Sequence, residues 1–213
     1  MSWLDYFLDF LFPKKCLGCK KEGDWFCPLC RKKIDYCVPS LERFPRSPLE
    51  GVVAIGYFRG LLREAIHLFK YEKTRELAKE LGDLFVSELQ KPENCFLLKW
   101  IFVPVPLHRA KQRERGFNQA ELLLYQVYQK LAIKTLRNNL IKIKNTPSQM
   151  QLKKEERLNN LKGAFAVLEK RQWEGKNIVL IDDVMTTGAT LTECAKVLKK
   201  AGAKRVFGLV LAR

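Results

Sequence analysis

Residues 177–191, which read NIVLIDDVMTTGATL, constrain the fold of this chain more than any other stretch. The apolar run at 178–181 is too short for a helix and suits a strand that is buried on both faces of a parallel sheet. Asp182 and Asp183 follow it, at the end of a strand where open α/β sheets place their ligands. A hydroxyl-rich turn at 186–190 comes next, and a helical pattern of apolar residues follows. The order predicts an α/β fold with a ligand site at this edge of the sheet.

The turn at 186–190 has the chemistry of a phosphate site. A small-residue turn that opens a helix has free backbone N–H groups, and threonine hydroxyls can complete a cage around one phosphate. Two adjacent carboxylates would repel that phosphate, so we expect them to bind hydroxyl groups or a divalent cation. A sugar phosphate satisfies both halves. The alternative is an ordinary strand-to-helix connection, in which Asp183 caps the helix and the threonines only shape the turn.

This segment resembles the phosphoribosyl pyrophosphate (PRPP) binding motif of type I phosphoribosyltransferases, a hydrophobic run followed by two acids and a TTGxT-like loop. In that family the acids hold the ribose hydroxyls and the loop cradles the 5′-phosphate. The resemblance therefore assigns ribose contacts to Asp182 and Asp183. It assigns the remaining substrate contacts of the motif to Val184, Met185, Thr186, Thr187, Gly188, Ala189 and Thr190.

The length and the charge of the chain limit which folds and which partners are possible. Its 213 residues leave room for one α/β core of roughly 150 residues and a small appendage. The net charge of +16 favours an acidic partner, such as PRPP or nucleic acid. The alternative is a solvated basic surface that only aids solubility.

Four of the seven cysteines form two pairs, Cys16-x-x-Cys19 and Cys27-x-x-Cys30. Four thiolates at this spacing can converge tetrahedrally on one structural zinc ion, which would stabilise a module too small to fold alone. A redox dithiol needs only one such pair. Cys37 is either an alternative ligand, a remnant of a second knuckle or an ordinary buried thiol, and we take the last as the default.

The N-terminal region predicts a small module, and the paired cysteines indicate a protein of the reducing cytoplasm. Residues 1–15 are apolar at helical spacing but too short to span a bilayer, and they lack the features of a secretory signal. We expect no transmembrane segment, and a short helix packed on the body. Prolines punctuate residues 38–50, which we interpret as a linker. The predicted domains are therefore 1–50, with the helix, the zinc knuckle and the linker, and 51–213, with the α/β body.

A strongly cationic segment follows the predicted strand at 100–105. We interpret it as a loop at the edge of the sheet that also holds the acid pair, where it could bind pyrophosphate or a nucleic-acid backbone. A solvated run of charge is the alternative. The potential cations of this loop are His108, Arg109, Lys111, Arg113 and Arg115. Further along, the polar stretch at 149–161 has few apolar anchors and predicts a mobile flap over the site.

Beyond the PRPP motif, the whole chain resembles the ComF family of competence proteins. The resemblance rests on the paired cysteines and on the segments FKYEK, VPVPLHRAKQRERGFNQA, TPSQMQLKKEERLNNLKGAF, IVLIDDVMTTGATL and AGAKRVFGLVLAR. It implies a zinc-finger module joined to a type I phosphoribosyltransferase fold, with a central, mostly parallel sheet flanked by helices. It also implies a role in DNA uptake during natural transformation, in the bacterial cytoplasm. The extra cysteine pairs of some relatives are missing here, so we expect a single zinc ion.

The resemblance leaves two functions open. In the first, magnesium-dependent transfer from PRPP releases pyrophosphate, which Arg109 and Arg115 stabilise, with Lys70 and Arg157 as further candidates. In the second, the protein is a non-catalytic competence factor that binds single-stranded DNA and keeps PRPP as a regulatory ligand. Other DNA-uptake proteins at the inner membrane face are candidate partners under both. No residue in the sequence identifies the acceptor.

Overall fold

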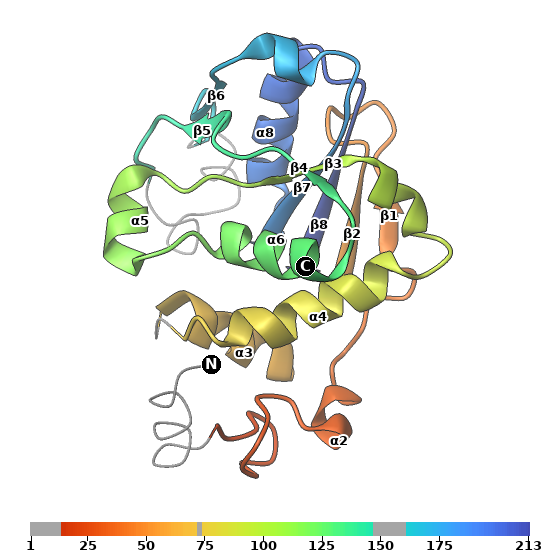
Figure 1. Cartoon of the computed structure of the whole chain (residues 1–213), viewed down its shortest axis with the longest axis vertical. Helices are drawn as coiled ribbons and strands as arrows, with labels where there is room; N and C mark the ends of the chain where they lie inside the picture. The colour runs from red at the N-terminus through yellow and green to blue at the C-terminus, as the bar shows by residue number, and fades with distance from the viewer. Residues whose placement is uncertain (1–13, 72–73, 147–160) are drawn as a thin grey trace.

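The structure, a computed structural model, describes residues 14–71, 74–146 and 161–213. A six-stranded sheet with the strand order β1-β2-β8-β7-β3-β4 forms its centre (Figure 1). Its strands are β1 (Leu41–Arg43), β2 (Gly51–Gly56), β8 (Arg205–Ala212), β7 (Asn177–Val184), β3 (Ile101–Pro104) and β4 (Lys134–Thr135). Every neighbouring pair is parallel except β1 and β2. The predicted α/β fold with a mostly parallel sheet is confirmed.

Helices cover both faces of the sheet. On one face lie α3 (Gly60–Tyr71), α4 (Leu77–Leu89) and α6 (Gln119–Lys130), and on the other lies α8 (Ala189–Lys200). Because side chains alternate along a strand, Val179 and Ile181 pack into the first apolar cluster, while Ile178 and Leu180 pack into the second. All four side chains are fully buried, which confirms the expectation of a strand covered on both faces.

A second, two-stranded sheet lies beside α8 and consists of β5 (Leu140–Lys142) and β6 (Phe165–Val167) in antiparallel pairing. The segment between these two strands contains the predicted flap. Residues 147–160, with Arg157, lie outside the described part of the chain, as do residues 1–13 with most of the predicted N-terminal helix. Both expectations stay predictions.

Two local expectations need correction. The cationic segment after β3 is a helix, α5 (Arg109–Arg115), rather than a loop, because His108 caps its first turn and Gly116 ends it at a φ of 81°. Strand β7 also continues through the acid pair, because Asp182 pairs with Val210 of β8. Both acids therefore lie at the end of the strand, where the pleat fixes the direction of each side chain.

The cysteine-containing module packs directly on the body. Leu17, Phe26 and Ile34 join the apolar cluster that contains Leu62 and Phe69 of α3. This region includes the short helix α2 (Pro28–Arg31), which lies below α3 in Figure 1. The expected linker at 38–50 contains β1, an edge strand of the main sheet. The division into 1–50 and 51–213 stays a prediction, although the apolar packing is continuous across it.

Two short 3-10 helices, η1 (Cys95–Lys99) and η3 (Lys170–Trp173), complete the described elements. Within the described ranges, none of the helices is both long enough and apolar enough to cross a bilayer.

Candidate functional site

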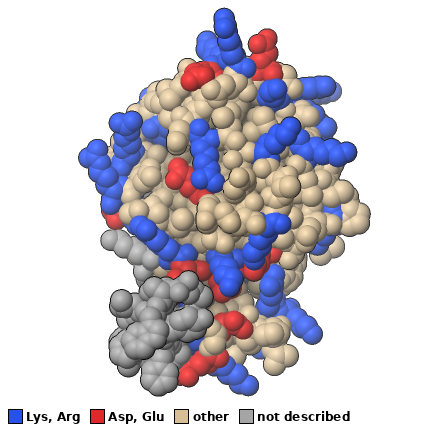
Figure 2. Space-filling model, viewed as in Figure 1, with Lys and Arg blue, Asp and Glu red and all other residues tan. Residues whose placement is uncertain are grey.

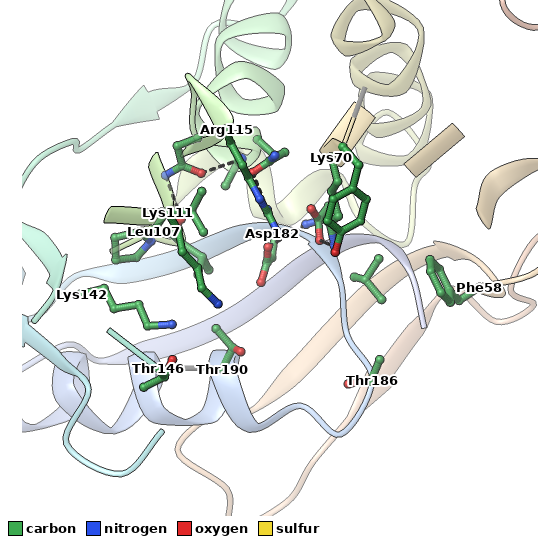
Figure 3. A pocket seen from close by; sticks show the side chains of 18 residues that line it. Phe58, Lys70, Leu107, Lys111, Arg115, Lys142, Thr146, Asp182, Thr186 and Thr190 are labelled. Atoms are coloured by element: carbon green, nitrogen blue, oxygen red, sulfur yellow. Dashed lines mark hydrogen bonds and ion pairs between the residues drawn. The ribbon is translucent and has the colours of Figure 1, made fainter. Parts of the chain in front are cut away.

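The acid pair lies in a pocket at the carboxyl end of β7 (Figure 3). The side chain of Asp183 is buried and forms an ion pair with Lys70, with 2.7 Å between Lys70 Nζ and Asp183 Oδ1. Asp182 is half-buried, and its Oδ1 accepts a hydrogen bond of 2.9 Å from the backbone N–H of Asp183. Lys70, which the resemblance had placed at pyrophosphate, thus contacts the carboxylate assigned to the ribose.

The two carboxylates differ in their electrostatic surroundings. Burial and the charge of Asp183 raise the pKa of Asp182 to about 7, although Lys70 counteracts this effect. Asp182 therefore holds a proton over much of the range below neutral pH. A ligand that presents hydroxyl groups or a cation would favour the ionised form, so binding at this site should be linked to proton release.

This raised pKa predicts that Asp182 destabilises the protein without its ligand at pH 8. A carboxyl group whose folded pKa lies above its unfolded value stabilises the fold at low pH, and that stabilisation is lost as the pH rises through about 7. We therefore expect Asp182→Asn to be more stable than the parent at pH 8 by about 1–2 kcal/mol, or about 3–6 °C in Tm. The advantage should shrink towards pH 5. Thermal melts between pH 5 and 8 measure it.

The control for this prediction is Asp24→Asn, which makes the same charge change at an exposed position away from the pocket. If both variants shift Tm equally at every pH, the net charge of the chain explains the effect. A less stable Asp182→Asn at pH 8 would contradict the raised pKa.

The turn after β7 places backbone groups beside the acids. Gly188 adopts a φ of 72°, which glycine reaches without strain, and α8 begins at the next residue. Thr187 Oγ1 accepts a hydrogen bond of 3.4 Å from the N–H of Ala189. Val184 and Thr190 line the pocket with the acids, Met185, Thr187 and Gly188 line a second hollow, and Thr186 lines both. The structure thus divides the expected substrate residues between two sides of one loop.

A cationic wall faces the acid pair from α5 and β5. Lys111 and Arg115 of α5 and Lys142 of β5 line the same pocket, and none of the three has an acidic partner among the described residues. Burial and Lys111 lower the pKa of Lys142, and burial and Arg115 lower the pKa of Lys111. The mutual repulsion of these groups favours an anion between them.

Arg109, the other arginine expected at this wall, points elsewhere. It is exposed and lines an adjacent hollow together with His108 and Leu168. Sequence reasoning missed Lys142, because Lys142 and Lys144 both alternate with isoleucines in the LIKIK segment. That alternation predicts a strand, but it does not say which lysine reaches a pocket.

The RGFNQA segment holds this wall in position. Asn118 caps α6 by accepting from the N–H of Ala120 at 3.0 Å, and its Nδ2 donates to the carbonyl of Val105 at 3.1 Å. Arg115 Nη1 donates to Gln119 Oε1 at 3.2 Å, and Phe117 packs on Phe69. The side chain of Asn118 therefore links Val105, the residue after β3, to the start of α6. Arg115 lies in the segment between these two points.

Two buried polar atoms of the pocket lack partners within the part of the chain that the structure describes. They are Gln119 Nε2 and Thr146 Oγ1, and both residues line the pocket. Buried donors and acceptors are normally hydrogen-bonded, so unpaired ones in a pocket indicate groups that a bound molecule satisfies.

The four-cysteine group forms a second site, on the module below α3. The Sγ atoms of Cys16, Cys19, Cys27 and Cys30 all lie within 4.8 Å of one another, and those of Cys19 and Cys27 are 3.7 Å apart. Tetrahedral thiolates at about 2.3 Å from a metal ion would be about 3.8 Å apart. The backbone N–H groups of Cys27 and Cys30 also point at sulfur atoms, at 3.4 Å each. The donor set fits a metal ion.

Cys37 lies outside this group, which agrees with its interpretation as an ordinary thiol. It is buried, and burial raises its pKa.

The positive charge of the chain is spread widely rather than confined to the pocket. Figure 2 shows Lys and Arg side chains over the whole visible face, with fewer acidic ones between them. Many of these cations are ion-paired, for example Lys130 with Asp83 and Lys199 with Glu50. Lys111, Arg115 and Lys142 form no ion pair within the described part of the chain, and they line the pocket that holds the acid pair.

Comparisons with known proteins agree with this geometry. Residues 118–213 match the phosphoribosyl transferase domain family, and the fold is that of a phosphoribosyltransferase-like core. Competence protein F of Haemophilus influenzae is 32% identical over 93% of this chain and 90% of its own length. Competence protein ComFC of Bacillus subtilis is 30% identical over 100% of this chain and 90% of its own. DNA utilization protein YhgH of Escherichia coli K12 is 28% identical over 90% and 85%. The chain belongs to the ComF family of competence proteins.

Proposed function

We propose that this protein binds PRPP with magnesium in the pocket at the end of β7 and transfers its phosphoribosyl group to an acceptor, with release of pyrophosphate. The observation that supports this most is the arrangement of one pocket, in which Asp182 and Asp183 lie between a threonine-rich turn and a wall of unpaired cations. A sugar that carries a phosphate at one end and a pyrophosphate at the other matches these three sets of groups.

Each set of groups has one task in this proposal. The carboxylates of Asp182 and Asp183 accept hydrogen bonds from the ribose hydroxyls, and the turn at 186–190 holds the 5′-phosphate. Lys111, Arg115 and Lys142 neutralise the charge that develops on the leaving pyrophosphate. A cation held in place before the reaction contributes on the order of 2–4 kcal/mol to such stabilisation. Magnesium, bound with PRPP, supplies further neutralisation of the pyrophosphate oxygens.

Lys70 acts on the acid pair in this scheme. Its ammonium group lies 2.7 Å from Asp183 Oδ1, so it reduces the repulsion between the two carboxylates. Both acids can then ionise beside a ligand that is itself highly anionic. Arg109 and Arg157 remain only predicted pyrophosphate contacts. Arg109 lies on the same helix as Lys111 but lines an adjacent hollow, and Arg157 lies outside the described residues.

The four cysteines would hold a structural zinc ion. Their sulfur atoms lie within 4.8 Å of one another, which supports a tetrahedral zinc site, and the ion would tie the two halves of the module together. The names of the relatives, competence protein and DNA utilization protein, support a role in handling incoming DNA. We place that role in the cytoplasm, with DNA-uptake proteins at the inner membrane face as candidate partners.

A second candidate function is non-catalytic binding of single-stranded DNA, with PRPP as a regulatory ligand. The observations that favour it are the net charge of +16 and the spread of cations over the surface. A hollow beside the pocket adds Arg109 and His108 next to the exposed side chains of Ile143 and Leu168. Positive charge can hold the phosphates of a single strand, and the aliphatic side chains add van der Waals contact to its bases.

Calorimetric titration of PRPP with magnesium tests the first proposal, and the Lys142→Gln variant tests the assignment of the cationic wall. The parent should bind with saturation and only in the presence of magnesium. Lys142→Gln should bind about tenfold more weakly or worse, because it removes from the wall one half-buried cation that has no acidic partner among the described residues. Lys144→Gln is the matched control, because it removes the same charge two residues away, where Lys144 is exposed and contacts the carbonyl of Lys162.

Equal weakening in the two variants would mean that only net charge matters, and the assigned wall would be wrong. If titration into the parent gives no saturable heat, the PRPP proposal itself is wrong. Binding of an oligodeoxynucleotide that falls steeply with added salt, without such heat, would favour the second function.

A further inference from the structure

Helix α5 carries two cations of the pocket wall, but apolar packing does not hold it in place. Figure 1 shows α5 at the edge of the body, and none of its side chains is buried or belongs to an apolar cluster. Lys111 and Arg115 are four residues apart, a spacing at which like charges destabilise a helix. The position of both cations therefore depends on contacts at the ends of α5. The inference drawn from these contacts rests on the proposed function.

Arg75 holds the C-terminal end of α5 from the connection between α3 and α4. Its Nη2 donates a hydrogen bond of 2.8 Å to the carbonyl oxygen of Gly116, the residue at which α5 ends. The dipole of a helix favours a cation at this end. The carbonyl oxygen of Arg75 accepts a hydrogen bond of 3.0 Å from the N–H of Ala78, in the first turn of α4. Arg75 thus connects the end of α5 to the start of α4.

The ring of Phe117 strengthens this connection. Cζ of Arg75 lies 5.1 Å from the centroid of that ring, within the range of a cation–π interaction. Phe117 is buried, and its ring centroid lies 5.7 Å from that of Phe69 on α3. Arg75 therefore contacts two successive residues after α5, one by a hydrogen bond and one by its planar guanidinium. Arginine can make both contacts at once, because its donors lie in the plane that stacks on a ring.

Gly116 permits this contact for two reasons. Its φ of 81° belongs to a region that residues other than glycine adopt only with strain. A Cβ atom at this position would also lie 3.3 Å from Arg75 Nη2, closer than most Cβ contacts, so the guanidinium would have to move. A side chain at position 116 therefore disturbs the contact with Arg75 without changing the charge of the chain.

The residue directly before Gly116 is Arg115, a cation of the pocket wall. Its Cζ lies 5.4 Å from the ring centroid of Tyr71, and its Nη1 donates to Gln119 Oε1 at 3.2 Å. Arg115 and Lys111 both line the pocket together with Asp182 (Figure 3). A shift of the helix end would displace both cations, and a misplacement of about 1 Å can cost about a hundredfold in rate.

We infer that Arg75 is a positioning residue of the proposed pyrophosphate site, and that its contact with Gly116 holds α5 where Lys111 and Arg115 reach the pyrophosphate. Arg75 does not line the pocket, so it acts through α5 rather than by contact with the ligand. The contact serves only one half of the ligand. The groups assigned to ribose and to the 5′-phosphate belong to β7, the turn after it and the start of α8, which Arg75 does not contact.

Calorimetric titration of the full chain with PRPP and magnesium tests this inference. Arg75→Gln and Gly116→Ala should each weaken binding about tenfold. The double variant should bind about as weakly as either single variant, because both substitutions break the same contact. In competition with PRPP, pyrophosphate with magnesium should also lose about tenfold in affinity, whereas ribose 5-phosphate should stay within about threefold of the parent. Retained binding of ribose 5-phosphate also shows that the variants are folded.

Gly175→Ala and Arg63→Gln are the matched controls. Gly175 has a φ of 67° in another turn, Arg63 is an exposed arginine on α3, and neither lines the pocket. Neither control should change the affinities by more than about twofold. The inference is overturned if Arg75→Gln or Gly116→Ala binds PRPP like the parent, if the two effects multiply in the double variant, or if both halves of the ligand are weakened equally. A parent that does not bind PRPP identifies the proposed function as the fault.

Discussion

Titration of PRPP with magnesium into the Asp182→Asn, Asp183→Asn double variant should give no saturable heat, whereas the parent binds. Each carboxylate accepts hydrogen bonds from the sugar in our proposal, and neutral amides would accept fewer and weaker ones. Loss of two charge-assisted contacts at about 1.5–3 kcal/mol each corresponds to at least a hundredfold loss in affinity.

Stability measurements separate loss of the site from loss of the fold. Asp182→Asn alone should be folded and more stable at pH 8, because the pKa of Asp182 is raised to about 7 in the parent. Asp183→Asn alone leaves the ammonium group of Lys70 without its carboxylate, so it should be the less stable single variant. If the double variant is folded and binds PRPP like the parent, the acid pair is not part of the binding site. Binding of DNA that survives the double substitution would show that DNA uses another surface.

Removal of the metal should have the largest effect on stability. A chelator, or Cys19→Ser, should lower Tm by about 10 °C or more, since a module of this size depends on its metal ion for folding. Leu17, Phe26 and Ile34 pack into the cluster under α3, so disorder of the module would expose part of the main core as well. Thermal melts with and without chelator, together with elemental analysis for zinc, measure this.

Cys95→Ser is the control, because Cys95 is an exposed cysteine outside the four-sulfur group. It should retain one zinc ion per chain and the Tm of the parent. Two results would contradict the proposal: protein purified without zinc that melts like the parent, or a Cys19→Ser variant that retains both zinc and stability.

The sequence by itself determined the parts of this protein whose physics is local. Four consecutive apolar residues at 178–181 suit a strand that is buried on both faces of a parallel sheet, and the turn after them has the composition of a phosphate site. Two Cys-x-x-Cys pairs at short separation can meet at one metal ion with little help from the rest of the chain. These features depend on residue type and spacing, so they could be predicted.

Only the tertiary structure decided which charged side chains meet. Lys70 and Asp183 are far apart in sequence, and they pair because α3 ends beside the carboxyl end of β7. Lys142 reaches the pocket and Lys144 does not, and Lys111 and Arg115 face the acids while Arg109 faces an adjacent hollow. Such choices follow from strand order and from register, such as Pro104 of β3 opposite Ile181 of β7. Local periodicity gives each element its faces, but only the packing of elements on one another decides what each face meets.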